Sequence, residues 1–120
     1  MLTYGEYKMK FPDRTKWTLG TVLEYRAENN AKGPYIQWTD EGEVLTFYEV
    51  NCIVNKFSHG WLEQGVKKGE TVVLFMENSL DLVWNWYALS KIGVIETPIN
   101  PEYKGAFLEH QVNNSLAKIA

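Results

Sequence analysis

The chain has 120 residues, of which 45% are apolar and 14% aromatic, so it can bury the core of one ordinary folded domain. Its formal net charge is −3, and its lysines are scattered among glutamates without forming a basic stripe. This pattern argues against disorder and disfavours nucleic acid or an anionic membrane surface as a partner.

Compartment and membrane association follow from three further features. No window approaches the roughly eighteen apolar residues of a membrane span, and the first residues lack the apolar core of a signal peptide. The single cysteine, Cys52, cannot form an internal disulfide. We therefore expect a soluble, cytoplasmic protein with no membrane span.

The first half of the chain predicts a helix, a hairpin and a second helix. Residues 18–30 have apolar side chains at helical spacing, and 35–38 and 44–45 read as two strands around an acidic turn. Thr46 has the position of a helix N-cap, with Glu49 completing a capping box, and the helix should run to Gly65. Its apolar face holds Phe47, Val50, Ile53, Val54, Phe57, Trp61 and Leu62, whereas Asn51 and Asn55 should face water.

The second half predicts a parallel sheet. Residues 71–76 are apolar without alternation, which indicates a central strand covered on both faces. Ser79 or Asn78 should cap a helix through Ile92 that leaves only a strip near Asp81 and Asn85 for solvent. A strand follows over 94–97, and Pro98 with Pro101 should end regular pairing. A last helix is expected over 104–114, and 117–120 should begin another strand.

The order strand, crossover helix, strand predicts an α/β fold in layers, with a mainly parallel sheet flanked by helices. The abrupt end and the very apolar helix suggest a piece of a larger protein. Such a piece should leave two or three of Trp84, Trp86 and Tyr87 half exposed, and we expect the isolated chain to form homo-oligomers through this helix or by strand addition.

Residue types that carry chemistry are few. Cys52 lies on the apolar side of its helix pattern, which predicts a buried, inert thiol. His59 and His110 are expected on the surface, without other ligands at metal-binding spacing. The acidic group Asp40, Glu41 and Glu43 is interpreted as a solvated turn.

Two further candidates are set aside. The segment Gly60–Lys67 resembles a phosphate-binding loop only loosely, because Val66 stands where the loop's lysine belongs. Trp84, Trp86 and Tyr87 could line an acyl pocket, but packing in the core or against the rest of a larger enzyme is the preferred interpretation. We assign no catalytic, cofactor-binding or metal-binding residue in this chain.

Five segments in fixed order carry a family resemblance. Leu45–Val50 resembles the motif L-T-[YF]-x-E-[LV], and Gly65–Val72 resembles G-V-x-x-G-D-x-V. Asn78–Ser79, Ala88–Gly93 and Pro98–Tyr103 resemble N-S, A-x-x-K-x-G and P-x-N-P-x-Y. Together they resemble the adenylate-forming enzymes, which include acyl-CoA synthetases and the adenylation domains of peptide synthetases.

The resemblance covers about residues 18–120 and leaves 1–17 as an N-terminal extension. It implies an incomplete N-terminal subdomain of the acyl-CoA synthetase fold. The parent enzyme would use ATP and Mg²⁺ to join a fatty-acid or carnitine-type carboxylate to AMP, and would then pass the acyl group to coenzyme A. The motifs for these steps lie downstream in complete members, so the implied partner is the remainder of the parent enzyme.

Two alternatives stay open. The chain could be a stand-alone, non-catalytic α/β interaction module derived from that fold. It could also be an enzyme active as it stands, although it has no evident nucleophile, base or metal constellation. The coding sequence beyond Ala120 would discriminate between a fragment and a module.

Overall fold

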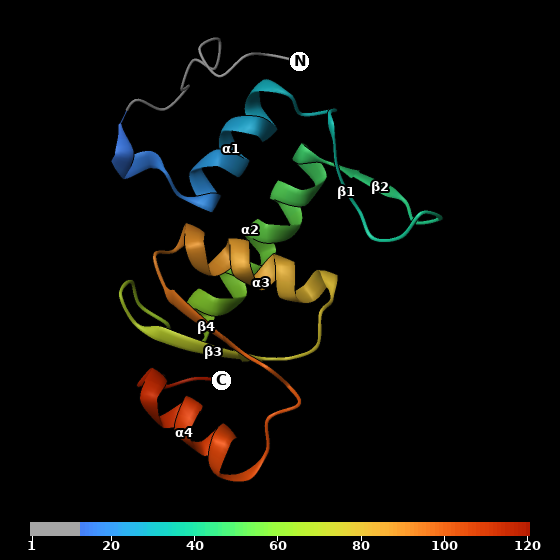
Figure 1. Ribbon diagram of the computed structural model, residues 1–120. Helices are drawn as coiled ribbons and strands as arrows, with labels where there is room; N and C mark the ends of the chain where they lie inside the picture. Colours follow the sequence, from blue (N-terminus) through green and yellow to red (C-terminus); the bar gives the residue numbers. More distant parts are fainter. Residues whose placement is uncertain (1–12) are drawn as a thin grey trace, which may run out of the picture.

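The computed structural model describes residues 13–120 (Figure 1). Of the expected N-terminal extension, residues 1–12 lie outside the described part, and a 3-10 turn, Arg14–Lys16, precedes the first helix. The elements in chain order are α1 Leu19–Asn29, β1 Pro34–Gln37, β2 Val44–Thr46, α2 Phe47–Glu63, β3 Thr71–Phe75, α3 Leu80–Lys91, β4 Ile95–Ile99 and α4 Gly105–Ser115.

Local capping explains where the first three helices begin. The Thr18 hydroxyl accepts the N–H of Thr21 at 3.1 Å, and the Ser79 hydroxyl accepts that of Leu82 at 3.2 Å. Thr46 accepts the N–H of Glu49, whose carboxylate accepts the N–H of Thr46 in return. The predicted capping box is therefore confirmed, because each partner satisfies a backbone donor that the first helical turn leaves free.

The predicted parallel sheet is present and small. β3 pairs in parallel with β4, with Val72 opposite Glu96 and Leu74 opposite Pro98. On its other side the Val73 N–H donates to the Ile119 carbonyl at 3.0 Å, so the last residues begin a third strand. β3 is thus central, as expected, and β1 with β2 forms a separate antiparallel hairpin.

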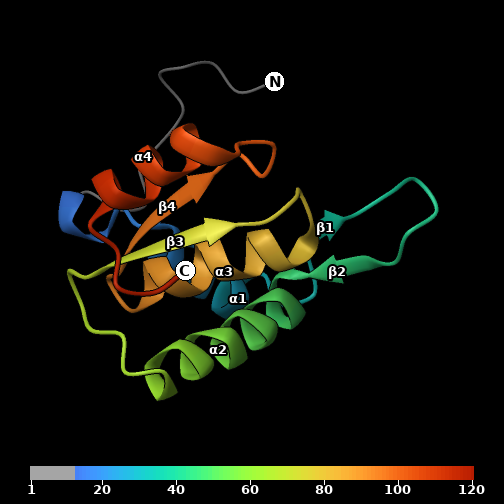
Figure 2. The same cartoon turned by 90° about the horizontal axis from the view of Figure 1, so that it is seen from below.

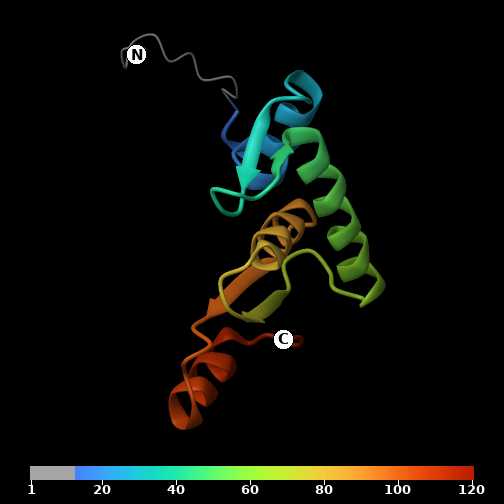
Figure 3. The same cartoon turned by 90° about the vertical axis from the view of Figure 1, so that its right-hand side faces the viewer.

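Helices cover both faces of the parallel sheet. Figure 2 shows β3 and β4 side by side, with α3 below them and α4 above. Figure 3 shows α2 outside α3, so that α2, α3, sheet and α4 follow one another as layers. This arrangement confirms the predicted α/β class.

Two apolar clusters hold these layers together. One joins α1, α2 and α3 around the buried side chains of Leu23, Val50, Val54, Trp84 and Ala88. The second lies between α3 and the sheet, around Val66, Val72, Leu74, Leu89 and Val94. Burial of these apolar side chains is the main favourable contribution to the free energy of folding of the described residues.

Strand β4 corrects the expectation that Pro98 ends regular pairing, because the strand runs through it to Ile99. The Ile95 N–H donates to the Glu70 carbonyl at 2.8 Å, which directs the backbone groups of Ile95 and Thr97 toward β3. Alternation then turns the backbone of Pro98 outward, where its missing N–H removes no bond of the sheet.

A polar contact joins α1, α2 and α3 and corrects the expectation for Asn51. Asn51 was expected to face water but is half-buried, whereas Asn55 is exposed as expected. The side-chain carbonyls of both accept from Lys91 Nζ, at 2.6 and 2.8 Å. Lys91 also donates to Glu24 on α1 at 3.0 Å. The lysine of the A-x-x-K-x-G motif therefore ties α3 to both α1 and α2.

Among the helices over residues 13–120, none has the length and apolar character needed to cross a bilayer.

Candidate functional site

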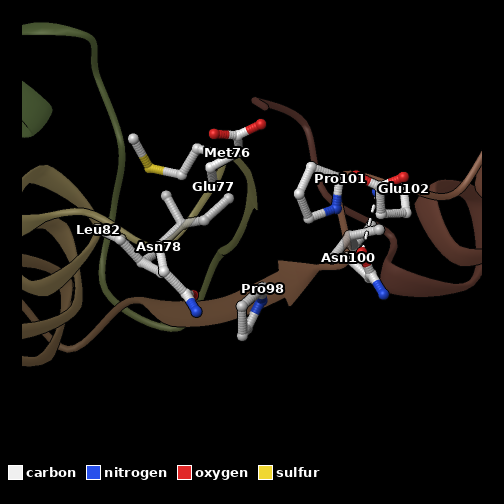
Figure 4. A pocket seen from close by; sticks show the side chains of 10 residues that line it. Met76, Glu77, Asn78, Leu82, Pro98, Asn100, Pro101 and Glu102 are labelled. Carbon is white, nitrogen blue, oxygen red and sulfur yellow. Dashed lines mark hydrogen bonds between the residues drawn. The ribbon is translucent and has the colours of Figure 1, made fainter.

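A hollow beside the sheet lies at the carboxyl ends of β3 and β4 (Figure 4). Open α/β sheets hold their ligands at this end of the strands, which makes the hollow the candidate site. It has a volume of about 450 Å³ and is lined by Leu74, Met76, Glu77, Asn78, Leu82, Pro98, Ile99, Asn100, Pro101 and Glu102.

Two of the family motifs, Asn78–Ser79 and Pro98–Tyr103, contribute residues to the rim of this cavity. Asn78 precedes Ser79, which caps α3, and the Asn100 side chain accepts the N–H of Glu102 at 2.9 Å. The second contact makes a turn that ends β4. Sequence reasoning recognised these residues only as family markers. The signal that could have placed them is their position directly after two parallel strands.

The charges on the rim decide what the cavity can hold. Glu77 follows β3 and Glu102 follows β4, and the ten lining residues include no lysine or arginine. Two carboxylates without a cation repel a triphosphate, so these residues do not fit the phosphates of ATP. We derive no catalytic step at this site.

The segment Gly60–Lys67 does not provide a phosphate cradle either. Its first part is the last turn of α2, whose negative dipole end disfavours anions. Val66 is buried, and the Lys67 N–H donates to the carboxylate of Glu70 at 2.9 Å. The turn also lies before β3, at the opposite end of the strand from the cavity.

The remaining polar candidates lie apart from one another. His59 on α2, His110 on α4 and the Asp40, Glu41 and Glu43 turn are all exposed, as expected. Over residues 13–120, no group of three His, Cys, Asp or Glu side chains is placed to hold a metal ion.

Cys52 corrects the prediction of a buried thiol. It is half-buried at the edge of the apolar face of α2, beside the exposed Tyr48. The hydrogen bond between these two side chains raises the pKa of the Tyr48 hydroxyl. The apolar pattern of the helix placed Cys52 near the core, but it did not show that Cys52 lies at the edge of the apolar face.

The three aromatic residues of α3 differ in their surroundings. Trp84 is buried in the core, and Tyr87 is half-buried, where its hydroxyl hydrogen-bonds with that of Tyr35 on β1. Burial raises the pKa of Tyr87. Trp86, by contrast, is 49% exposed. The solvent-exposed surface of α3 is therefore wider than the expected strip near Asp81 and Asn85.

Trp86 covers a second, smaller cavity that sequence reasoning missed. It has a volume of about 120 Å³ and lies between Leu74, Leu82, Trp86, Glu96 and Pro98. The Trp86 side chain hydrogen-bonds to the Glu96 carboxyl group, and burial raises the pKa of Glu96 to about 7. A glutamate inside a strand of otherwise uncharged residues was the signal available in the sequence.

The fold and this site define the class of the protein: an α/β unit whose parallel strands end in a cavity rimmed by the N-S and P-x-N-P-x-Y motifs. The AMP-binding enzyme family model matches residues 23–120. The chain belongs to the family of AMP-binding enzymes.

Individual relatives agree with this assignment. The chain is 34% identical to a long-chain-fatty-acid–CoA ligase of Salmonella typhimurium, over 87% of the chain and 18% of the relative. It is 31% identical to surfactin synthase subunit 1 of Bacillus subtilis, over 90% of the chain and 3% of the relative. The chain therefore spans less than a fifth of the length of either protein.

Solved structures show the same fold. The N-terminal domain of FACL13 from Mycobacterium tuberculosis superimposes with a TM-score of 0.77 at 22% identity, over 85% of this chain and 26% of that one. The N-terminal subdomain of NpsA from Klebsiella oxytoca, in complex with anthranilyl-AMSN, gives a TM-score of 0.76 at 16% identity, again over 85% and 26%. The described residues thus have the fold of a part of such domains.

Proposed function

We propose that residues 18–120 are the N-terminal scaffold of an ATP-dependent acyl-CoA synthetase acting on a fatty-acid or carnitine-type carboxylate. The observation that carries this proposal is the family match over 23–120, together with the identity to a long-chain-fatty-acid–CoA ligase. In this proposal the first 17 residues are an extension, and the partner of the scaffold is the remainder of the parent enzyme.

The parent reaction defines what the scaffold would serve. The carboxylate is joined to AMP with release of pyrophosphate, and coenzyme A then takes the acyl group, so ATP, Mg²⁺ and coenzyme A are the implied cofactors. The part contributed by residues 18–120 is structural: a sheet, its helical layers and the Lys91 contact between helices. The acidic rim of the main cavity supports a site for ATP elsewhere in the parent enzyme.

A stand-alone, non-catalytic interaction module is the alternative function. Its support is that two apolar clusters form within the described residues, so the unit has a core of its own. The coding sequence beyond Ala120 separates the two: a continued frame with a Ser/Thr/Gly-rich lysine loop supports the scaffold, and a stop codon supports the module.

Catalysis by the chain alone is tested by calorimetry with ATP–Mg²⁺ and by carboxylate-dependent pyrophosphate exchange. We expect neither appreciable binding nor exchange. A dissociation constant in the low micromolar range, lost in Lys67→Ala or Lys68→Ala, would show that the site for ATP had been placed in the wrong part of the enzyme.

Self-association of the isolated chain stays a prediction. Strand addition at β4 is opposed by Pro98, which has no N–H to offer on the open edge. Exposed apolar side chains remain on α3 and α4, where Trp86 is 49% and Phe107 is 74% exposed. Light scattering after size exclusion, on wild type, Trp86→Lys and Phe107→Lys, should show an oligomer that one substitution disperses. A wild-type monomer at high micromolar concentration would contradict the prediction.

A further inference from the structure

The Glu96 carboxyl group has one oxygen without a partner. Trp86 hydrogen-bonds to the group, but Oε2 is inaccessible to solvent and receives no hydrogen bond from any described residue. A buried acceptor left unpaired costs free energy, and native proteins satisfy nearly all such atoms. Glu96 lines the smaller cavity, called the cleft below, and its carboxyl group has hydrogen-bonding capacity that the described residues do not use.

The walls of this cleft are apolar and one of them is an indole. Leu74, Leu82 and Pro98 line it together with Trp86, whose ring is half exposed. The face of a tryptophan ring attracts a cation placed over it. The occupant thus combines a donor for Glu96 with a flat or positively charged surface for Trp86.

The open edge of β4 adds acceptors and almost no donors. Because Ile95 bonds to β3, alternation turns the backbone of Glu96 and Pro98 away from the sheet. Two carbonyls and a single N–H are then left on this edge, since proline has no N–H. This imbalance disfavours a β-strand as occupant and favours a group that only donates.

The charged side chains that line the cleft and the neighbouring cavity are all acidic. The neighbouring cavity shares Leu74, Leu82 and Pro98 with the cleft and brings Glu77 and Glu102. Among the side chains lining the two hollows there is no lysine or arginine. A guanidinium group has five N–H donors in one plane, no acceptor and a permanent charge, and it stacks on aromatic rings.

We propose that the cleft between Trp86 and Glu96 holds an arginine side chain presented by the polypeptide that completes the AMP-binding enzyme. The guanidinium stacks on the Trp86 indole and donates to the Glu96 carboxylate and to the outward carbonyls of β4. The proposal rests on the proposed function, because a scaffold that spans 26% of a solved N-terminal domain has the rest of that domain to meet.

The test follows the Trp86 indole N–H by nuclear magnetic resonance in the chain labelled at its five tryptophans. Trp86→Phe removes one indole signal and so assigns it. Titration with N-acetyl-L-argininamide should move this signal saturably, with a dissociation constant in the millimolar range. N-acetyl-L-citrullinamide has nearly the same shape as the arginine probe but no charge. N-acetyl-L-lysinamide carries the positive charge but has no planar guanidinium group. Both should bind at least about tenfold more weakly.

Glu96→Gln keeps the shape of the side chain and should weaken the arginine response by about tenfold or more, because it removes the charge partner. Glu109→Gln, on the exposed surface of α4, is the matched control and should leave the response unchanged. Retained dispersion of the other indole signals shows that each variant is folded.

Three results would overturn the proposal. The first is an equal response to the arginine, lysine and citrulline probes, or one that Glu96→Gln leaves intact. The second is much tighter binding of agmatine than of the peptide analogue, which would make a free guanidino compound the ligand. The third is an oligomer that only Trp86→Lys disperses, which would make a second copy the occupant. None of these readouts uses ATP or pyrophosphate exchange, so failure here is distinguishable from failure of the proposed function.

Discussion

Lys91 allows one substitution to test how three helices are joined. Its Nζ donates to Glu24 on α1 at 3.0 Å and to Asn51 and Asn55 on α2 at 2.6 and 2.8 Å. The side chain of Lys91 is only 7% exposed, whereas that of Glu24 is 55% exposed. Lys91→Met keeps the length of the side chain and removes all three hydrogen bonds.

The expected cost follows from the exposure of each partner. A hydrogen bond to a charged group contributes about 1.5–3 kcal/mol when it is well buried, but here two acceptors lie near solvent and regain water when the ammonium is lost. The pair with the exposed Glu24 adds no more than about 0.5 kcal/mol. We therefore expect Lys91→Met to lower the free energy of unfolding by about 2 kcal/mol.

Urea unfolding followed by tryptophan fluorescence measures this change. For an m value of about 1–2 kcal/mol/M, the midpoint should fall by about 1–2 M at constant m. Lys118→Met is the control: it removes a 2.8 Å ion pair with Glu70, but the Lys118 side chain is 78% exposed. Its midpoint should change by less than about 0.5 M, because exposed pairs contribute little. Equal midpoints for the two variants would refute the argument that burial of the Lys91 ammonium joins the helices.

Three further predictions concern close packing, capping and a buried acid. Gly20→Ala should destabilise the chain by about 1–3 kcal/mol in thermal unfolding, because its Cβ would lie 2.8 Å from Lys91 Cγ and 3.0 Å from Lys91 Cα. Gly60→Ala, whose new Cβ would meet no atom within 4 Å beyond the backbone of its own helix and its chain neighbours, should instead stabilise α2 by about 0.5–1 kcal/mol. Thr46→Ala should cost about 1 kcal/mol by removing the cap of α2, while Thr46→Ser stays near wild type; equal losses would contradict the capping role. Burial raises the pKa of Glu96 from 4.5 to about 7, so the folded state holds this proton more tightly than the unfolded state. Its contribution to stability should be full below about pH 4.5 and lost as the pH rises through 7, a slope on the order of 1 kcal/mol after solvent screening that Glu96→Gln should abolish.

The sequence by itself determined the elements whose causes are local. The capping box of Thr46 and Glu49 needs only residues three apart, and the apolar run at 71–75 needs only its own composition to indicate a strand covered on both faces. The family motifs fall at the ends of such elements, so they also placed the family. The apolar periodicity of α2 correctly indicated the buried face around Val50 and Val54, although Leu62 at its end is 50% exposed.

Only the tertiary structure decided which polar side chains meet. Lys91 lies 67 residues from Glu24 and 40 from Asn51 along the chain, and no periodic pattern within one helix links them. Trp86 and Glu96 likewise come from α3 and β4, and their cleft exists because the sheet brings the two elements together. Cys52 and Pro98 were misplaced for the same reason: the margin of a helix face and the open edge of a strand are set by neighbouring elements. Local sequence records the spacing of side chains along one element, whereas burial and partners depend on how separate elements pack.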